Sequence, residues 1–256
     1  MRGLAGKAFI VAGAGSGIGA AAAVRLAEEG ASVVVGDLNA ENAEKVAARI
    51  GRQGGSAVAV PFDIADESSV DALVRRTLDV FARVDGVHIN AADLSPATFE
   101  RDADPATVPL EIFDRTIAVN LRGHLLLTQR VLPELRERGG SIVYTASAAA
   151  ITGGSGRSAY AMSKGGLLSL SRHVAHGHGK QGIRSNVVAP GHVLTEGVLS
   201  RAANDKSLLE RSLAGVPSTR LGEAADIAAA VAFLLSDDAT WINGQILSID
   251  GGATMR

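Results

Sequence analysis

Short runs of apolar, β-branched residues alternate along this chain with longer stretches in which apolar and polar positions recur at helical spacing. The apolar runs predict strands over residues 8–13, 32–37, 56–63, 84–92, 140–147, 182–190 and 245–252. Helices are predicted after Gly17 as far as Gly30, over 40–50, after a cap at Asp66, and over 110–138, 158–176 and 223–236. This alternation is typical of a parallel sheet with helices on both faces, which assigns the chain to the α/β class.

Two segments interrupt the alternation. Residues 93–109 carry three prolines and scattered charge and are predicted to form a surface loop. Residues 194–220 are predicted to be loop with a short helix. Because the chain shows no repeat, no low-complexity tract and no long linker, residues 1–256 are interpreted as one domain.

Composition narrows the class of protein. Apolar residues make up 46% of the chain and charged residues 20%, which suits a soluble globular protein. The net charge of −2 and the lack of a Lys/Arg run make nucleic acid and an anionic membrane poor candidate partners. The sequence has no cysteine, which excludes disulfides and thiolate chemistry. With no signal-like start in residues 1–12 and no apolar run near the ~18 residues of a membrane span, a cytoplasmic location is expected.

A glycine-rich turn separates the first predicted strand from the first predicted helix. Gly13, Gly17 and Gly19 lie in this turn, which reads GAGSGIG over residues 13–19. Glycines let a backbone approach a pyrophosphate closely, and the N–H groups that open the following helix meet its charge. An ordinary glycine turn is the alternative, but the placement between strand and helix favours a dinucleotide site.

Acidic residues follow the second and third predicted strands. Asp37 comes eighteen residues after Gly19, close to the ~20-residue offset of a carboxylate that binds the adenosine ribose hydroxyls. A helix cap or turn is the alternative role for Asp37, since Asn39 follows it. Asp63 and Ile64 are candidates for adenine contact by the same logic, with turn chemistry as the alternative for Asp63.

A candidate proton-transfer group lies in the helix predicted over 158–176. Tyr160 and Lys164 are four residues apart and share a helix face, and Ser147 ends the fifth predicted strand. A tyrosine hydroxyl ordinarily ionises near pH ~10, and a neighbouring ammonium stabilises its phenolate. The Ser147 hydroxyl is suited to hold a substrate oxygen that exchanges its proton with Tyr160. An aromatic anchor beside a solvated lysine is the alternative, but the glycine turn favours an oxidoreductase.

Taken in order, these motifs resemble the short-chain dehydrogenase/reductase family. The resemblance covers essentially the whole chain and rests on the GxxxGxG turn, Asp37, Asn90-Ala91, Asn120, Ser147, the YxxxK pair, Pro190-Gly191 and Asp250-Gly251-Gly252. It implies a Rossmann-type, doubly wound sheet of seven mostly parallel strands in the order 3-2-1-4-5-6-7, with helices on both faces. The chain departs from the family pattern at Ala12, Ile89, Ala92 and Ala146, none of which removes a catalytic group.

The resemblance also implies a set of site residues. The catalytic tetrad is matched by Asn120, Ser147, Tyr160 and Lys164. Cofactor contacts are matched by Gly13, Ser16, Gly17, Ile18, Gly19, Asp37, Asp63, Ile64, Asn90, Ala91, Tyr160, Lys164, Pro190, Gly191, Val193 and Thr195. Substrate contacts are assigned to Ala149, Gly154, His192 and Leu194. No metal site is expected at His173, His176 and His178, because only the first two of these histidines share a helix face.

The implied mechanism is reversible hydride transfer between a nicotinamide and a carbinol carbon. In the tetrad, Tyr160 exchanges the proton, Ser147 holds the substrate oxygen, and Lys164 lowers the tyrosine pKa. Asn120 would free a backbone carbonyl of its helix to hold a water.

The predicted function is therefore NAD(H)-dependent interconversion of a secondary alcohol and a ketone, both small molecules. Asp37 would repel the 2′-phosphate of NADPH, and neither Ser16 nor Leu38 supplies a cation to receive it. An NADPH-dependent 3-oxoacyl-carrier-protein reductase is thus the weaker alternative. A non-catalytic dinucleotide sensor is weaker still, because the tetrad is complete. The resemblance further implies a homotetramer, in which the helices over 110–138 and 158–176 pack against those of another subunit.

Overall fold

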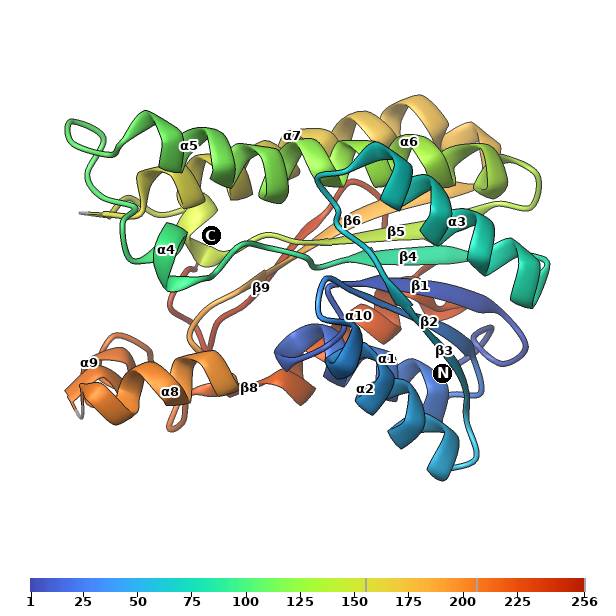
Figure 1. Cartoon of the computed structure of the whole chain (residues 1–256), viewed down its shortest axis with the longest axis horizontal. Coiled ribbons are helices and arrows are strands. Elements are labelled where there is room, and N and C mark those ends of the chain that lie inside the picture. The colour runs from blue at the N-terminus through green and yellow to red at the C-terminus, as the bar shows by residue number, and fades with distance from the viewer. Residues whose placement is uncertain (155, 206, 256) are drawn as a thin grey trace.

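The computed structural model describes residues 1–154, 156–205 and 207–255, and within these residues it contains a seven-stranded parallel sheet (Figure 1). The strand order is β3-β2-β1-β4-β5-β6-β9, which confirms the predicted order. The strands are β1 (Ala8–Ala12), β2 (Ser32–Asp37), β3 (Ser56–Pro61), β4 (Gly86–Ile89), β5 (Gly140–Thr145), β6 (Ile183–Pro190) and β9 (Ile246–Ile249).

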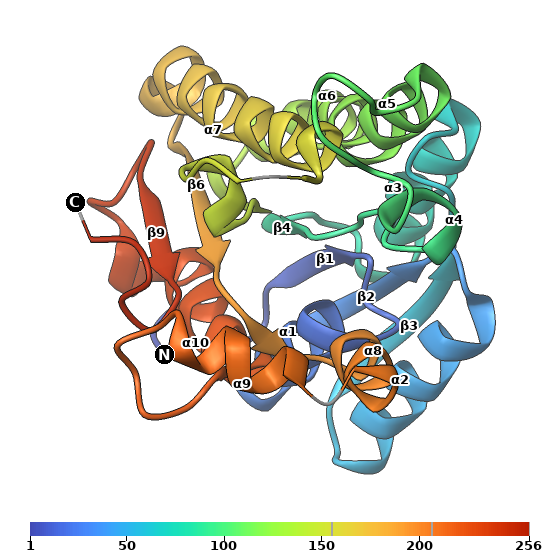
Figure 2. The same ribbon diagram turned by 90° about the vertical axis from the view of Figure 1, so that its left-hand side faces the viewer.

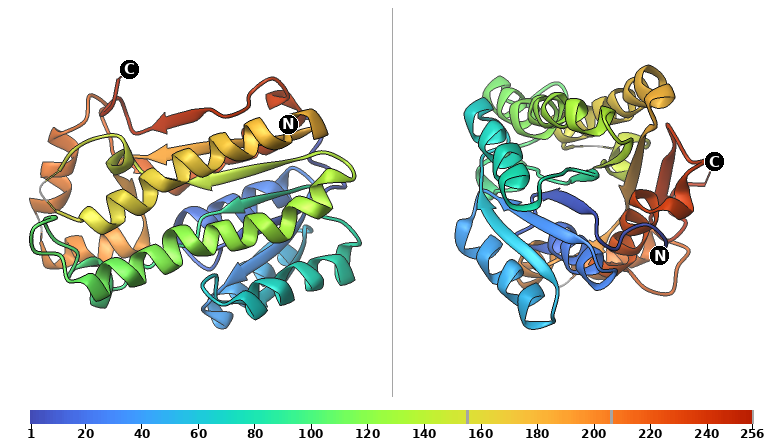
Figure 3. Two further views of the ribbon diagram at one scale, coloured as in Figure 1. Left: turned by 90° about the horizontal axis from the view of Figure 1, so that it is seen from above. Right: turned by 90° about the vertical axis from the view of Figure 1, so that its right-hand side faces the viewer.

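Helices cover both faces of the sheet. One face is packed by α1 (Gly17–Glu28), α2 (Ala40–Arg52) and α10 (Ala224–Leu235). The other face is packed by α3 (Glu67–Phe81), α6 (Gly123–Arg136) and α7 (Ser158–His178), with α5 (Leu110–Ile117) beside α7. Viewed from above, the run of α5 and α6 lies alongside α7 (Figure 3). None of the helices in the described ranges is long and apolar enough to cross a membrane.

The position of β1 inside the sheet explains why its sequence is apolar without interruption. Successive side chains of a strand point to opposite faces, and both faces of this sheet are buried under helices. Phe9 and Val11 belong to the core against α1 and α10, whereas Ile10 and Ala12 belong to the core against α3, α6 and α7. A polar residue at any of these positions would therefore enter one core or the other.

Side-chain caps fix where two helices start. The Asp66 carboxylate accepts a hydrogen bond from the Ser69 N–H at 2.8 Å, which confirms the predicted cap of α3. The Asn39 side chain accepts from the Asn42 N–H at 3.0 Å and caps α2. Because Asn39 is the cap there, Asp37 is left free for another role.

The two segments outside the alternation contain more structure than the sequence predicts. The loop predicted over 93–109 includes the short helix α4 (Pro96–Phe99), which starts with proline at its first turn. Residues 194–220 contain α8 (Glu196–Asn204) and α9 (Ser207–Ala214). A small parallel pair, β7 (Val193–Leu194) with β8 (Gly222–Glu223), ties this segment down. Such short elements depend on tertiary contacts that periodicity does not encode.

The helix predicted over 110–138 is present over nearly this range, but it is not one continuous α-helix. It consists of α5, a π-helical turn (Ala118–Arg122) and α6. π-Helical turns within α-helices are frequent at functional sites, and this one contains Asn120.

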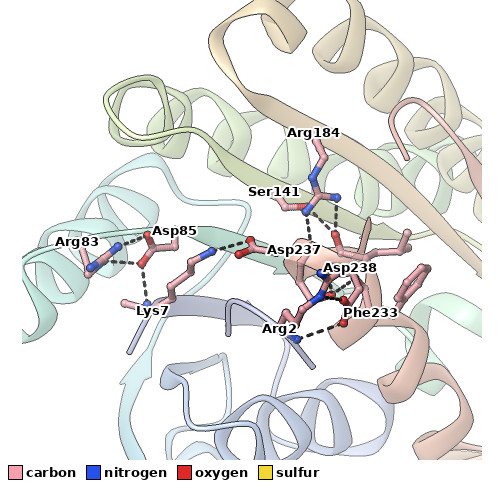
Figure 4. Close-up of polar contacts among 12 residues, drawn as sticks. Arg2, Lys7, Arg83, Asp85, Ser141, Arg184, Phe233, Asp237 and Asp238 are labelled. Carbon is pink, nitrogen blue, oxygen red and sulfur yellow. Dashed lines mark hydrogen bonds and ion pairs between the residues drawn. The ribbon is translucent and has the colours of Figure 1, made fainter. Parts of the chain in front are cut away.

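Polar contacts join neighbouring chain segments at the end of the sheet where its strands begin (Figure 4). The buried Asp85 carboxylate accepts from the Ala8 N–H at 2.8 Å and pairs with Arg83. Arg184 of β6 donates to the carbonyls of Leu234 and Ser236 at 2.7 and 3.0 Å, which joins β6 to the end of α10. These contacts stabilise the end of the sheet at which the strands begin. The end at which the strands finish is left available for a functional site.

Candidate active site

A cavity of about 1400 Å³ opens at the C-terminal ends of the parallel strands. Residues that follow β1, β2, β4, β5 and β6 line it, and α8 lies across the sheet end from α4 and α7 (Figure 2). Ligands of open α/β sheets bind at these strand ends, where the strand order reverses. Pockets for a drug-sized molecule are ~300–1,000 Å³, so the cavity has room for a dinucleotide and a substrate together.

Nearly all of the predicted cofactor contacts line this cavity. They are Gly13, Ser16, Gly17, Ile18, Asp37, Asp63, Ile64, Asn90, Ala91, Tyr160, Lys164, Pro190, Gly191, Val193 and Thr195. Gly19 is the exception, because it is buried against the turn and does not line the cavity. A Cβ at Gly19 would lie 1.9 Å from the Gly13 carbonyl oxygen, so this glycine lets helix and turn pack closely.

The glycine turn is held in shape by its neighbours. Gly13 has φ of +81°, and a Cβ there would lie 2.6 Å from the Cα of Ala91. The Asn90 side chain donates to the Gly13 carbonyl at 2.9 Å. Ser16 precedes α1 without a capping hydrogen bond from its side chain, so the N–H groups that open the helix remain available to an anion.

Asp37 presents a fixed carboxylate to the cavity. One of its oxygens accepts from the Gly15 N–H at 2.7 Å and the other from the Asn39 N–H at 2.9 Å. A carboxylate has about four acceptor positions, so each oxygen retains capacity for a hydroxyl donor. Asp63 lines the cavity and also accepts from the Ala65 N–H at 2.8 Å within its own turn, so it has the turn role, while its adenine contact stays a prediction.

Three members of the predicted tetrad come together at the centre of the cavity lining. Lys164 is 1% exposed, donates from Nζ to the Thr145 carbonyl at 2.8 Å, and lies 5.7 Å from the centre of the Tyr160 ring. Ser147 follows β5 and forms a hydrogen bond that lowers the pKa of Tyr160. The structure therefore brings the tyrosine, the serine and the lysine together in the lining of one cavity.

Asn120 supports this group from behind and does not line the cavity. It is buried, its oxygen accepts from the Asp93 N–H at 2.9 Å, and its amide donates to Ser163 at 3.4 Å. Ser163 in turn donates to the Tyr160 carbonyl at 2.7 Å. Asn120 lies in the π-helical turn, and the expected release of its backbone carbonyl stays a prediction.

The electrostatics of Tyr160 differ from the sequence-based expectation. Burial raises the pKa of Tyr160 above its ordinary value, against the lowering effects of Ser147 and of the Arg157 charge. Lys164 was expected to lower the tyrosine pKa, but burial instead lowers the pKa of Lys164 itself to about 7. An amine with this pKa is already neutral at the higher pH at which Tyr160 ionises, so it does not lower the tyrosine pKa, although it is charged at the lower pH at which the neighbouring histidines titrate.

Two buried histidines beside Lys164 are site features that the sequence analysis missed. His88 of β4 meets Thr145 Oγ1 at 2.7 Å through Nε2, and His124 of α6 stacks on Tyr144 with ring centres 6.4 Å apart. Burial, and next the Lys164 charge, lower the pKa of His88 to about 3 and hold that of His124 well below 6.5. The sequence signal that could have identified them was a histidine at an otherwise apolar position, once in a predicted strand and once in a predicted helix.

The substrate side of the cavity agrees with the prediction except at one residue. Ala149, Gly154 and His192 line the cavity, whereas Leu194 pairs in the small β7–β8 sheet instead. Phe99 of α4 also lines it and meets the Tyr160 ring edge-on at 5.3 Å. Phe99 was missed because its segment has no periodicity that would have placed it.

The predicted polar end of α7 contains His178, whose Nδ1 pairs with the Gln181 side-chain oxygen at 3.0 Å. Within the ranges that the structure describes, no group of three or more His, Asp or Glu side chains is placed to hold a metal ion.

Comparison with known proteins agrees with this site. The chain is 38% identical over 255 residues to levodione reductase of Leifsonia aquatica, covering 96% of this chain and 93% of the relative. It is 36% identical over 254 residues to the 7alpha-hydroxysteroid dehydrogenase of Escherichia coli K12, covering 99% and 96%. A solved 7alpha-hydroxysteroid dehydrogenase, complexed with NADH and 7-oxo glycochenodeoxycholic acid, superimposes with a TM-score of 0.91 at 36% identity over 100% of this chain and 96% of that one.

The sheet order, the glycine turn and the Ser147–Tyr160–Lys164 group define an oxidoreductase of the short-chain dehydrogenase/reductase class. Within that class, residues 13–254 match the family described as enoyl-(acyl carrier protein) reductase, and the chain belongs to this family.

Replacing His124 with phenylalanine is expected to make folding less sensitive to acid. The unfolded chain binds protons near the ordinary histidine pKa of 6.5 whereas the folded rings stay neutral, so the free energy of unfolding falls as pH drops below 6.5 towards about 3. Each such histidine adds a slope of about 1.4 kcal/mol per pH unit. His124→Phe keeps a ring against Tyr144 and removes one slope, which urea denaturation at several pH values between ~7 and ~5 measures.

The control is His173→Gln, which removes an exposed histidine of α7 and should leave the slope unchanged. Equal slopes for the wild type and His124→Phe would show that His124 is not held neutral in the folded protein.

Proposed function

We propose that this protein interconverts a secondary alcohol and a ketone with NAD(H) as the hydride carrier. The observation that carries the proposal is the placement of Ser147, Tyr160 and Lys164 in one cavity with the glycine turn and Asp37. The first group suits proton transfer at a substrate oxygen, and the second suits a dinucleotide. The relatives named as a reductase and a dehydrogenase support the same reaction class.

The residues present fit a bound nicotinamide cofactor. The turn at Gly13 and the opening of α1 would hold the pyrophosphate, and Asp37 would accept from the ribose hydroxyls. Pro190, Val193 and Thr195 line the cavity next to the tetrad, where the nicotinamide belongs in this proposal. When bound, NAD supplies the acceptor for hydride from the carbinol carbon.

The protein groups would manage the proton of the same carbinol. As the hydride leaves carbon, the Tyr160 phenolate would accept the hydroxyl proton while the Ser147 hydroxyl donates a hydrogen bond to the substrate oxygen. Burial disfavours this phenolate, and the positive charge of the oxidised nicotinamide, when bound, would favour it. In the reverse direction the Tyr160 hydroxyl gives its proton to the carbonyl oxygen that gains the hydride. The pKa of about 7 for Lys164 lets its amine gain or lose a proton near neutrality, next to the tyrosine.

We also propose that the protein is a cytoplasmic homotetramer. Leu110 and Leu125, on the α5–α6 run, are 75% and 42% exposed, so pairing of this run would remove their apolar surface from water. Trp241, just before β9, is 99% exposed. Pairing through the α5–α6 run, and again beside β9, would cover both sets and give closed symmetry.

Light scattering of the wild type is expected to report a tetramer at micromolar concentration. Leu110→Glu with Leu125→Glu should reduce it to a dimer, because like charges would then face each other across the paired helices. Val80→Glu, at a 39% exposed position on α3, is the control and should remain a tetramer. A monomeric wild type would contradict the assembly and leave the proposed reaction untouched.

Tyr160→Phe is expected to keep cofactor binding and to lose turnover by about a hundredfold or more, because the ring remains and the proton donor is gone. The matched control is Tyr144→Phe, which removes the other tyrosine hydroxyl of the chain, one that is buried against Thr128 outside the cavity. Oxidation of a panel of secondary alcohols, followed as NADH absorbance, gives the rates. Near-normal turnover by Tyr160→Phe would refute the assignment, and tight NADH binding without turnover of any alcohol by the wild type would indicate a sensor.

Cofactor choice is expected to depend on the charge of Asp37. Its carboxylate can accept from a ribose 2′-hydroxyl but would repel a 2′-phosphate, and the adjoining side chains are those of Leu38 and Asn39. At ~1.4 kcal/mol per tenfold, the wild type should prefer NAD by about two orders of magnitude in kcat/KM. Asp37→Ala with Leu38→Arg should relax or reverse the preference, and Asp37→Asn, of the same shape, should reduce it. Equal efficiency with NAD and NADP in the wild type would show that Asp37 does not face the ribose.

A further inference from the structure

Two arginines each place a guanidinium over the same aromatic ring, that of Phe99, in the lining of the cavity. The guanidinium carbon of Arg157 lies 4.2 Å from the centre of the Phe99 ring, and that of Arg201 lies 5.3 Å from it. The same ring meets the edge of Tyr160 at 5.3 Å. Both guanidiniums therefore lie about one aromatic ring beyond the residue that transfers the proton, and all four side chains line the cavity.

These two arginines have no carboxylate partner within the described ranges of the chain, whereas a third arginine of the cavity has one. Arg115 pairs with Asp93 at 3.0 Å, so its charge is already balanced. Glu196 also lines the cavity from the first turn of α8, but no ion pair joins it to Arg157 or Arg201. Two unbalanced positive charges thus face the space that a substrate would occupy.

The backbone at Arg157 is unfavourable for an arginine in two ways. It is a non-glycine residue in the left-handed region, at φ 57° and ψ 43°, where side chains other than glycine, asparagine and aspartate are uncommon. It is also the N-cap of α7, where the helix dipole disfavours a cation and favours an anion. The N–H groups of Ala159 and Tyr160 in the first turn of α7 already donate to the Asp102 carboxylate at 3.1 and 2.8 Å, so a further anion would balance the guanidinium charge and not the helix start.

We propose that the substrate of the reaction proposed above is a carboxylic acid, with its carboxylate bound by Arg157 and Arg201 and its apolar body along the apolar part of the cavity lining. Guanidinium groups bind carboxylates through paired N–H donors, and stacking on a buried ring such as that of Phe99 holds each group in place. The lining includes Leu94, Ala149 and Met162, which suit the apolar part of such a molecule. The carbinol or ketone carbon would then reach Ser147 and Tyr160 at the other end.

The test compares alicyclic hydroxy acids with their own methyl esters, which keep the carbinol and the carbon skeleton and lose only the negative charge. With NAD in excess and NADH absorbance as the readout, the wild type is expected to prefer the acid over its ester by about tenfold in kcat/KM, or ~1.4 kcal/mol. Arg157→Met with Arg201→Met should abolish this preference, mainly through the KM of the acid. Arg157→Lys should retain part of it, because the charge remains without the planar fork.

Arg76→Met is the matched control, since it removes an exposed arginine of α3 that does not line the cavity. It should keep the acid preference, and thermal unfolding of every variant shows whether it folds. Because the comparison of acid with ester is made first on the wild type, the proposal can fail even if the double variant does not fold.

The outcomes separate the two proposals. If the wild type oxidises esters and neutral alcohols as well as the acids, or if the double variant keeps the acid preference, the carboxylate site is wrong and the dehydrogenase assignment stands. If neither acids nor esters nor neutral alcohols give NADH in a Tyr160-dependent way, the proposed function fails and the substrate class fails with it.

Discussion

The buried amine of Lys164 is the constraint on which the rest of the site depends. Its side chain enters the interior from α7 and finds the Thr145 carbonyl at the end of β5 as the acceptor for Nζ. Moving the pKa from 10.5 to about 7 corresponds to roughly 5 kcal/mol in favour of the neutral amine, at ~1.36 kcal/mol per pKa unit. Such an amine keeps its place only if β5 and α7 are fixed relative to each other, which the packing of α7 against β6 and the central sheet provides.

The side chains around Lys164 include two buried, uncharged histidines, which do not neutralise its charge. His88 and His124 approach it from β4 and α6, and both are held neutral by burial and by the lysine itself. Neither ring nitrogen of His124 has a hydrogen-bond partner, although the carbonyls of Val119 and Ile89 partly oppose the lowering of its pKa. Burial alone lowers the pKa of Lys164, whereas the lysine charge in turn lowers the pKa of both histidines. The buried groups beside Tyr160 therefore all favour their uncharged forms.

Much of this arrangement can be predicted from the sequence, for identifiable physical reasons. Strand order and the glycine turn are predictable because each follows from local spacing, as Gly13 and Asp37 illustrate at the ends of β1 and β2. The tetrad is predictable because Tyr160 and Lys164 are one helical turn apart and the rest follows from resemblance. The π-helical turn is not, since Asn120 lies in a run with ordinary helical periodicity. The pairing of Leu194 in β7 is not predictable either, because a two-residue strand gives no signal of its own.

The substrate end was the hardest to predict because it depends on contacts between segments that are distant in sequence. Phe99, Arg157 and Arg201 come from α4, the start of α7 and α8, and no spacing in the chain links them. Their charge also disappears in the net value of −2, which averages over the whole chain. In the fold, the carboxylate of Asp37 lies at one part of the cavity lining and the two guanidiniums at another. The Asp37 carboxylate accepts from hydroxyl donors, whereas the guanidiniums donate to an anion, so these two parts of the cavity lining favour different chemical groups and can orient a cofactor and a substrate independently.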